Sequence, residues 1–423
     1  MAAEPLALPR DAPPLVVPTA PERTLRDTVD ACADALVATA FRSGRRAGWL
    51  HWQHDAEGAP TTMRAGGAAL YDGDLGTAWA CAELGVALDR SDLVDLALTV
   101  AADAIPRARA LPEGLLGGVH GVALAARRIE ACTGTSLAGV PAPATAAPAE
   151  SDLGAGAAGM LLVASHDVAD ALLSRLQRRA VRTDAGWCWP GGPPDPGETA
   201  PGRALTGLAH GGSGVAFAAA EVAARYPDLA GRAAEVVRQA LAWERAWFDP
   251  VRSGWPDLRS DPPTWPVRWC HGAAGVGAVR LHLLGLVDDG LDLGVPTESL
   301  LAEAEVAVRA CGQAIGQAVA GAGGTDRVWA DGGLTLCHGI GGALDVLALA
   351  GRAWRSDAHV DAARELAAEL VGLLPTEPVR WPTGARGRGA PGLFLGLAGA
   401  AWLLARVAEP TLGLPSPSLL GRR

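Results

Sequence analysis

Two cysteine–histidine pairs stand out in the sequence, because each directly precedes a glycine-rich turn. Cys270-His271 lies in the segment WCHGAAG, and Cys337-His338 lies in LCHGIGG. Two thiolates and one imidazole suit tetrahedral zinc, and a catalytic zinc keeps three protein ligands and one open position. Cys270, Cys337 and His338 meet this description. Adjacent Cys-His pairs are weak evidence alone, since zinc ligands within a segment are usually two to four residues apart.

The elements that carry these pairs belong to a repeat. A Gly-x-x-Gly turn followed by an apolar, alanine-rich segment recurs seven times. The turns begin at Gly73, Gly118, Gly156, Gly211, Gly272, Gly339 and Gly396. The segments after the turns are apolar nearly all round, which predicts buried helices, whereas the stretches between them carry one apolar stripe, which predicts covering helices. These amphipathic stretches lie at 24–43, 91–109, 166–183, 228–247, 298–320 and 356–374.

This alternation predicts an all-α fold: an α/α toroid, or double barrel, with seven inner and about seven outer helices. Residues 133–150 carry three prolines and no helical stripe, so an outer helix is expected to be short or missing there. An open solenoid is the alternative, although its end repeats would usually be atypical, and here the first and last copies look like the others. Residues 1–23 are expected to form a proline-rich flexible lead, and residues 24–423 a single domain.

The register of the repeat supplies the geometry that the Cys-His pairs lack. Aligned on the first glycine of each turn, the preceding position holds His210, His271 and His338 in three adjacent repeats. One position earlier, Cys270 and Cys337 fall in two adjacent repeats. Equivalent positions should face the same end of a ring, so the register favours one shared metal site over two unrelated cysteines buried in tight turns.

Composition and charge exclude several classes of function. The chain has 36 basic residues, all arginine, against 46 acidic ones, and its net charge of −10 disfavours a nucleic-acid partner. The N-terminal segment has no signal-peptide pattern. The longest apolar stretch of the chain, at 389–405, is shorter than the ~20 residues that span a membrane. We therefore expect a cytoplasmic protein with no integral membrane segment. Its seven cysteines then argue against a disulfide framework.

The turns LAHG, WCHGAAG and LCHGIGG resemble those of the lanthionine synthetase C-like cyclases. The sequence is most similar to the cyclase half of the class II lanthipeptide synthetases, which LYDGDLG and the segment PGLFLGLAGAAWLLARV also resemble. The similarity covers about residues 65–420. It implies a Zn²⁺ ion bound by Cys270, Cys337 and His338. It also implies acid–base and supporting roles for His210, His271 and Asp152.

The resemblance implies a zinc-dependent cyclase of lanthipeptide, and hence antibiotic, biosynthesis. Such enzymes add peptide cysteine thiols to dehydroalanine or dehydrobutyrine in a dehydrated precursor peptide, which forms (methyl)lanthionine thioether rings. Zinc keeps the thiol ionised, and a histidine with a pKa near neutrality suits protonation of the resulting enolate. His210 is the first candidate for this acid. Asp152 is expected either to orient the imidazole of His210 or to cap a helix.

The chain has no room for the large dehydratase domain of the bifunctional synthetases, so a separate dehydratase is an expected partner. Three other functions stay open on the sequence. A non-catalytic, zinc-containing module of the same fold could bind a thiol peptide or glutathione. A zinc-dependent prenyltransferase would need an aromatic lipid cavity, and the chain has only 2 Tyr and 4 Phe. A toroidal glycosidase would need a facing pair of carboxylates, which no repeat position offers.

Overall fold

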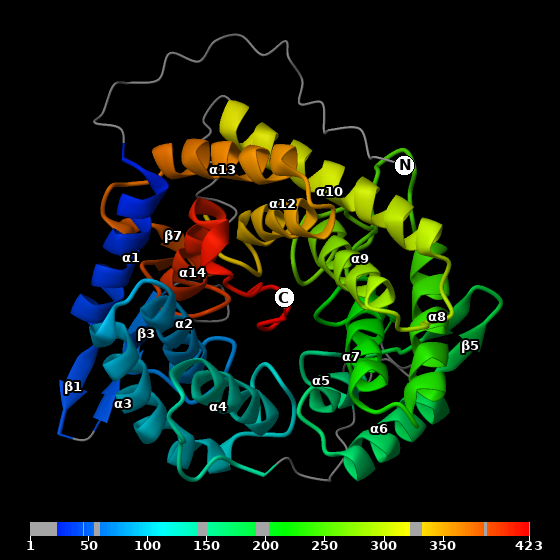
Figure 1. The fold of residues 1–423 in the computed structure, drawn as a ribbon, viewed down its shortest axis with the longest axis horizontal. Coiled ribbons are helices and arrows are strands. Elements are labelled where there is room, and N and C mark those ends of the chain that lie inside the picture. Colours follow the sequence, from blue (N-terminus) through cyan, green and yellow to red (C-terminus); the bar gives the residue numbers. More distant parts are fainter. Residues whose placement is uncertain are drawn as a thin grey trace.

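The computed structural model describes residues 23–44, 46–54, 60–142, 150–191, 203–321, 332–384 and 387–422. Figure 1 shows its helices in two concentric rings. The inner helices are α2 (Asp74–Ala87), α4 (Val119–Thr133), α5 (Ala157–Leu161), α7 (Gly212–Arg225), α9 (Ala273–Asp288), α12 (Gly341–Ala353) and α14 (Leu397–Ala408). The outer helices are α1 (Leu25–Thr39), α3 (Ser91–Arg107), α6 (His166–Arg179), α8 (Ala230–Arg245), α10 (Thr297–Ala320) and α13 (Asp357–Gly372). The predicted α/α toroid and its seven inner helices are confirmed.

The outer ring holds six helices within the described residues, one fewer than the expected number of about seven. The gap lies between α4 and α5, where residues 134–142 and 150–156 contain no helix and α5 itself has five residues. This is the region in which the prolines predicted a short or missing helix; residues 143–149 lie outside the described residues. The predicted N-terminal lead also lies outside them, apart from Arg23. The first helix begins where Thr24 and Asp27 form a capping box.

The repeated glycines are explained by close backbone contacts. The first glycine is the N-cap of six of the seven inner helices; α12 instead begins after Ile340. The second glycine of every turn lies against the carbonyl oxygen of the residue six positions earlier, and a Cβ there would come within 1.9–2.6 Å of that oxygen. No larger residue fits without moving the backbone, which is why the Gly-x-x-Gly spacing recurs.

A nearly complete ring of backbone hydrogen bonds joins the seven turns. Six junctions are closed by N–H···O bonds of 2.8–3.4 Å between equivalent positions. These positions run from Tyr71 through Leu116, Gly154 and Ala209 to Cys270, and from Cys337 through Phe394 back to Tyr71. At the seventh junction, between Cys270 and Cys337, the structure shows no such backbone bond; the Cys270 Sγ atom instead lies 3.7 Å from the Cys337 carbonyl oxygen.

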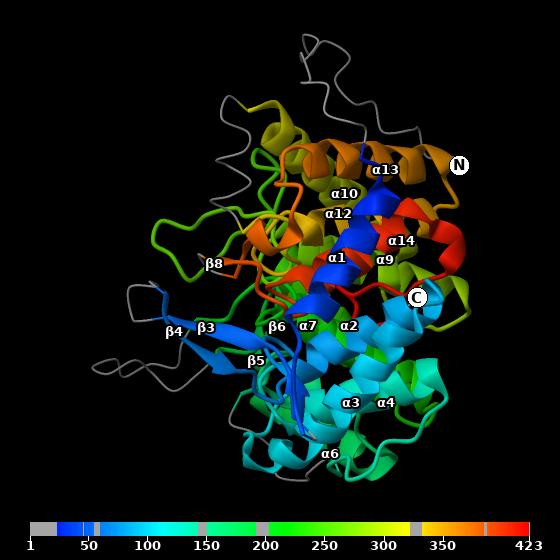
Figure 2. The same ribbon diagram turned by 90° about the vertical axis from the view of Figure 1, so that its left-hand side faces the viewer.

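The described part of the chain holds four antiparallel hairpins between outer and inner helices, and no sequence pattern predicted them. They pair β1 (Phe41–Ser43) with β2 (Arg46–Gly48), β3 (Leu50–His54) with β4 (Pro60–Ala65), β5 (Val181–Thr183) with β6 (Gly186–Cys188), and β7 (Pro382–Thr383) with β8 (Gly387–Arg388). Each follows an outer helix, except that β3–β4 follows β1–β2. The β3–β4 and β7–β8 hairpins project from the same side of the helices in Figure 2. Strands of two to six residues are too short for their periodicity to be recognised.

Two of the hairpins are fixed to the preceding outer helix in the same way. The indole N–H of Trp49 donates to the carbonyl of Leu36, and that of Trp189 to the carbonyl of Leu176, both at 2.9 Å. Both tryptophans are buried. Short 3₁₀ helices complete the connections at η1 (Ala108–Ala110), η2 (Pro378–Arg380) and η3 (Pro410–Leu412). None of the described helices combines the length and apolarity needed to cross a membrane.

The C-terminal segment lies at the centre of the ring (Figure 1). There the buried Asp345 of α12 binds Arg406 of α14 at 2.6 Å, the Ser416 hydroxyl at 2.5 Å and the Ser418 N–H at 3.2 Å. The Ser418 carbonyl in turn accepts from the Trp269 indole at 2.8 Å. An ion pair inside the barrel thereby holds the chain end against the residue that precedes Cys270.

Candidate functional site

Cys270, Cys337 and His338 lie together at one junction of the ring. Their ligand atoms are all within 4.8 Å of one another. Cys270 comes from the turn before α9, and Cys337 and His338 from the turn before α12. Both cysteines are buried and His338 is half-buried. The structure thus brings together the three residues that the repeat register selected.

The two thiols are coupled through a hydrogen bond. That bond lowers the pKa of Cys270 to about 4 and, together with burial, raises the pKa of Cys337. Opposite shifts of this kind are expected when one sulfur accepts a hydrogen bond from the other. All seven cysteines of the chain are free. Two buried sulfurs and an imidazole nitrogen within 4.8 Å of one another fit a soft divalent cation such as zinc.

His210 and Asp152 form a second cluster on the turns before α7 and α5. The Nδ1 atom of His210 lies 2.7 Å from Asp152 Oδ2. The other oxygen of Asp152 accepts from the Ala155 N–H at 2.8 Å, so this carboxylate stabilises its own turn as well as orienting the imidazole. The bond to Asp152 raises the pKa of His210. With Nδ1 engaged, the Nε2 atom is the one that remains for acid–base chemistry.

His271 occupies the space between the two clusters. Its ring stacks on that of His210, with centroids 5.6 Å apart and an interplanar angle of 23°. It is 1% exposed, and neither ring nitrogen has a hydrogen-bond partner among the described residues. Burial lowers the pKa of His271, in contrast to its neighbour. The two histidines therefore differ in charge preference although they occupy equivalent repeat positions.

Tyr71 contacts the cluster of Cys270, Cys337 and His338, a role that was not predicted from the sequence. Its side chain hydrogen-bonds with that of Cys337 and stacks on Phe394, with ring centroids 5.3 Å apart. A signal was present, because Tyr71 occupies the same repeat position as Cys270 and Cys337. Closure of the ring through Phe394 places the first turn near the sixth, which the linear spacing does not reveal.

A charged loop residue was also missed. Arg259 lies in the connection between α8 and α9 and binds the largely buried Asp257 through two nitrogens, with Nη2–Oδ2 2.6 Å and Nε–Oδ1 3.0 Å. Its charge acts on His210, His271 and Cys270. No repeat position marks Arg259, because it lies in an irregular loop, so only the folded structure shows that a cation faces both clusters.

Cavities flank the two clusters. A narrow one beside Asp152 and His210 is lined by Trp189 and Trp243, and one of about 240 Å³ lies beside His338, against Pro266. A cavity of about 720 Å³ lies elsewhere; it is lined by residues of α2, α4 and α7 and by the chain end. The clusters themselves lie at the opposite end of the ring, where the inner helices begin.

The model of the family described as lanthionine synthetase C-like protein matches residues 165–420, more than half of the chain. The chain belongs to the lanthionine synthetase C-like family. Among solved structures, nisin cyclase is similar to this chain with a TM-score of 0.51 and 15% sequence identity, over 84% of this chain and 92% of that one. This likeness supports the toroidal fold. A comparison with the curated proteins gives no match.

The family match and the hydrogen bonds cover different parts of the site. The matched region contains Cys270, Cys337 and His338 and both stacked histidines, and it begins after Asp152. A role for Asp152 therefore depends on its contact with His210 and not on the family match. In this member of the lanthionine synthetase C-like family, the ring of turns connects the cluster of Cys270, Cys337 and His338 with the pair of Asp152 and His210.

Proposed function

We propose that this protein is a zinc-dependent lanthipeptide cyclase, which adds cysteine thiols of a dehydrated precursor peptide to dehydroalanine or dehydrobutyrine. The observation that carries the proposal is the meeting, at one end of the ring, of two buried thiols and an imidazole with a carboxylate-bound histidine. The first set suits activation of a thiol, and the second suits delivery of a proton. Michael addition of a thiol requires both.

Cys270, Cys337 and His338 would hold the zinc ion. Zinc bound there would keep a substrate thiol in its ionised, nucleophilic form near neutral pH, where a free thiol is mostly protonated. Addition of the sulfur to the β-carbon of the dehydroamino acid moves the electron pair of the double bond onto the α-carbon and its carbonyl. The cysteine thiol loses one proton and the α-carbon gains one, so the mass of the peptide is unchanged.

His210 is our candidate for the acid that completes this step. Asp152 fixes its ring at Nδ1, which leaves Nε2 to give a proton to the α-carbon. The raised pKa keeps a larger fraction of His210 protonated near neutrality. His271, neutral and stacked on that ring, would keep water from one face of it. Its role is supporting.

Within this proposal, residues 24–423 act as one cyclase domain in the cytoplasm. The described residues from Thr24 onward form the toroid and its hairpins. We also propose that a separate enzyme dehydrates the serines and threonines of the precursor. The substrate of this chain would then be the peptide that the other enzyme has dehydrated.

The test offers the purified, zinc-loaded protein two forms of a precursor from its gene neighbourhood. With the form already dehydrated by a separate enzyme, we expect loss of free thiols, followed by alkylation, at constant peptide mass. With the unmodified form we expect no change. Water-loss products from the unmodified form would contradict the division of labour. Retention of all thiols in the dehydrated form would contradict catalysis and favour a non-catalytic module that binds a thiol peptide or glutathione.

A further inference from the structure

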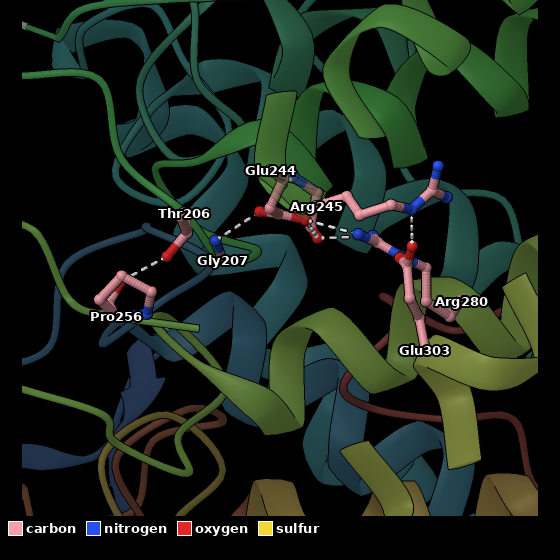
Figure 3. A network of polar contacts seen from close by, with 8 residues as sticks. Thr206, Gly207, Glu244, Arg245, Pro256, Arg280 and Glu303 are labelled. Atoms are coloured by element: carbon pink, nitrogen blue, oxygen red, sulfur yellow. Dashed lines mark hydrogen bonds and ion pairs between the residues drawn. The ribbon is translucent and has the colours of Figure 1, made fainter. Parts of the chain in front are cut away.

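A chain of charged side chains links helices α8, α9 and α10 in the wall of the toroid (Figure 3). Arg280 of inner helix α9 lies between Glu244 of outer helix α8 and Glu303 of outer helix α10. Its Nη2 atom is 2.9 Å from Glu244 Oε2, and its Nε atom is 2.6 Å from Glu303 Oε2. Arg245 binds the other oxygen of Glu303. Arg280 and Glu244 are completely buried. This chain of charges is referred to below as the Arg280 network.

Glu244 clamps both ends of the turn that carries His210. A single oxygen of this carboxylate, Oε1, accepts the Gly207 N–H at 2.8 Å and the Ser213 N–H at 3.1 Å. The second oxygen accepts the Ser213 hydroxyl at 2.5 Å. The same hydroxyl accepts from Arg280 Nη1 at 2.9 Å. Both ends of the loop 207–213 are therefore fixed by charged groups from the outer and inner rings.

The clamped turn is packed between its two neighbours. Gly207 has φ +99°, and a Cβ on it would lie 2.7 Å from the Cys270 carbonyl oxygen. On the other side, the Gly154 N–H donates to the Ala209 carbonyl at 2.9 Å, two residues after Asp152. A shift of the turn would therefore change the position of the His210 ring relative to Asp152 on one side and to the Cys270 turn on the other.

We propose that the Arg280 network is the positioning element for His210: Glu244, held by Arg280, fixes the 207–213 turn so that His210 meets both Asp152 and the metal-side turn. Residues of the network act through the turn and touch neither metal nor substrate. The inference rests on the proposed function for its catalytic meaning, while its structural claim concerns this chain alone.

Arg280 and Glu303 both favour their charged forms despite their burial. Burial opposes the charged form of Arg280, but Glu303 and Glu244 outweigh burial and raise its pKa. Burial likewise opposes ionisation of Glu303, and Arg280 outweighs it, so the pKa of Glu303 is lowered. Removal of one partner would leave its neighbour charged and unpaired, which is unfavourable in a low-dielectric interior. The network therefore has one strongly preferred arrangement, a property that suits a positioning element.

Glu244→Gln and Ser213→Ala are the mild tests, and Arg280→Met is the severe one. A glutamine at 244 keeps one oxygen for the backbone amides but turns an N–H₂ group toward Arg280, so the clamp loses its support. The readouts are metal per chain, titration of His210 by NMR of histidine-labelled holoprotein, and the pH profile of cyclisation. His210→Asn assigns the NMR signal. We expect zinc to be retained and the pKa of His210 to fall, because its bond to Asp152 is loosened.

The expected catalytic effect is a decrease in kcat of about 10- to 100-fold with KM little changed, since small misplacements of a reacting group have effects of this size. Arg406→Met is the matched control: Arg406 is also a largely buried arginine of an inner helix paired with a buried carboxylate, Asp345. It should lower stability without moving the His210 titration.

An unchanged His210 titration in folded Glu244→Gln and Ser213→Ala would overturn the proposal, and so would an equal change in Arg406→Met. If Arg280→Met does not fold, the two mild variants still decide. Titration needs no substrate, so failure of the cyclase proposal and failure of the positioning proposal give different results. The former would appear as a wild-type protein that leaves every dehydrated peptide unchanged, with the titration shifts still present.

Discussion

The thiol side and the imidazole side of the site are built on neighbouring turns of one ring, yet their environments are opposite. Cys270 and Cys337 are 5% and 2% exposed, and each sulfur has the other as a hydrogen-bond partner. The His210 side chain is 41% exposed and is bound by a carboxylate. Two buried sulfurs beside an imidazole suit a metal cation, because all three ligand atoms lie within 4.8 Å of one another. Partial exposure beside Asp152 favours an imidazole that gains and releases protons.

The two sides also differ in what lies behind them. The thiol side is supported by the chain end, because Asp345 fixes Ser418 and Ser418 accepts the indole N–H of Trp269. The imidazole side is supported by the Arg280 network from the outer ring. Equivalent positions of a repeat thus acquire different chemistry through different neighbours. A substitution on one side should therefore change that side and leave the properties of the other side in place.

The largest effect is expected from Cys337→Ala. Loss of one of two sulfurs leaves a donor pair too poor for a structural or catalytic zinc, which uses three or four protein ligands. Metal analysis should fall from about one zinc per chain to none, and thioether formation should cease. The titration of His210, on the other side, should persist with the bond to Asp152 intact. Full zinc content in this variant would show that the metal assignment is wrong.

A smaller effect is expected from His210→Asn, which keeps a polar side chain but removes the proposed acid. Positioned acid catalysis typically contributes ~10²–10⁴-fold, so cyclisation of a dehydrated peptide should slow by that factor. Zinc content and affinity for the peptide thiol should remain at the wild-type level. A variant that cyclises as fast as the wild type would move the acid role to His271 or to water.

The smallest effect is expected from Asp152→Asn, and it should appear mainly in the pH profile. The acid must be protonated, so the rate falls as pH rises through the pKa of His210, which Asp152 raises. The groups that act on this ring are Asp152, His271, Arg259 and Cys270. Loss of the carboxylate lowers the pKa, and the falling limb should move to lower pH. An unmoved limb in kcat/KM would show that the Asp152 contact does not tune the acid.

The ring and the metal-side residues were predictable because they depend on periodicity. Seven Gly-x-x-Gly copies set the number of inner helices, and the common register of Cys270, Cys337 and His338 brought them to one height. A buried all-apolar helix and a backbone contact that admits only glycine both leave clear marks in a sequence. The family match over residues 165–420 confirms the same resemblance.

The supporting residues were not predictable, because they follow no periodicity. Arg259 lies in an irregular loop, and the partners Glu244 and Arg280 lie on helices from two different layers, without a fixed spacing between them. The orientation of Asp152 required the contact between two turns that are 58 residues apart. The hairpins β1–β8 were missed because their strands are too short to show alternation.

The ring of backbone bonds between turns has a consequence for protein design. Because six junctions are closed by equivalent N–H···O bonds, the turn positions along them lie at the same height on one rim of the toroid. A Cys pair with its histidine, moved to another junction such as that of Leu116 and Gly154, would reach this height but would meet a junction that a backbone bond already closes. A Cβ at Gly154 would also lie 3.1 Å from the His210 ring. Relocation of the thiol site would therefore require opening of the new junction, because the missing backbone bond distinguishes the junction between Cys270 and Cys337.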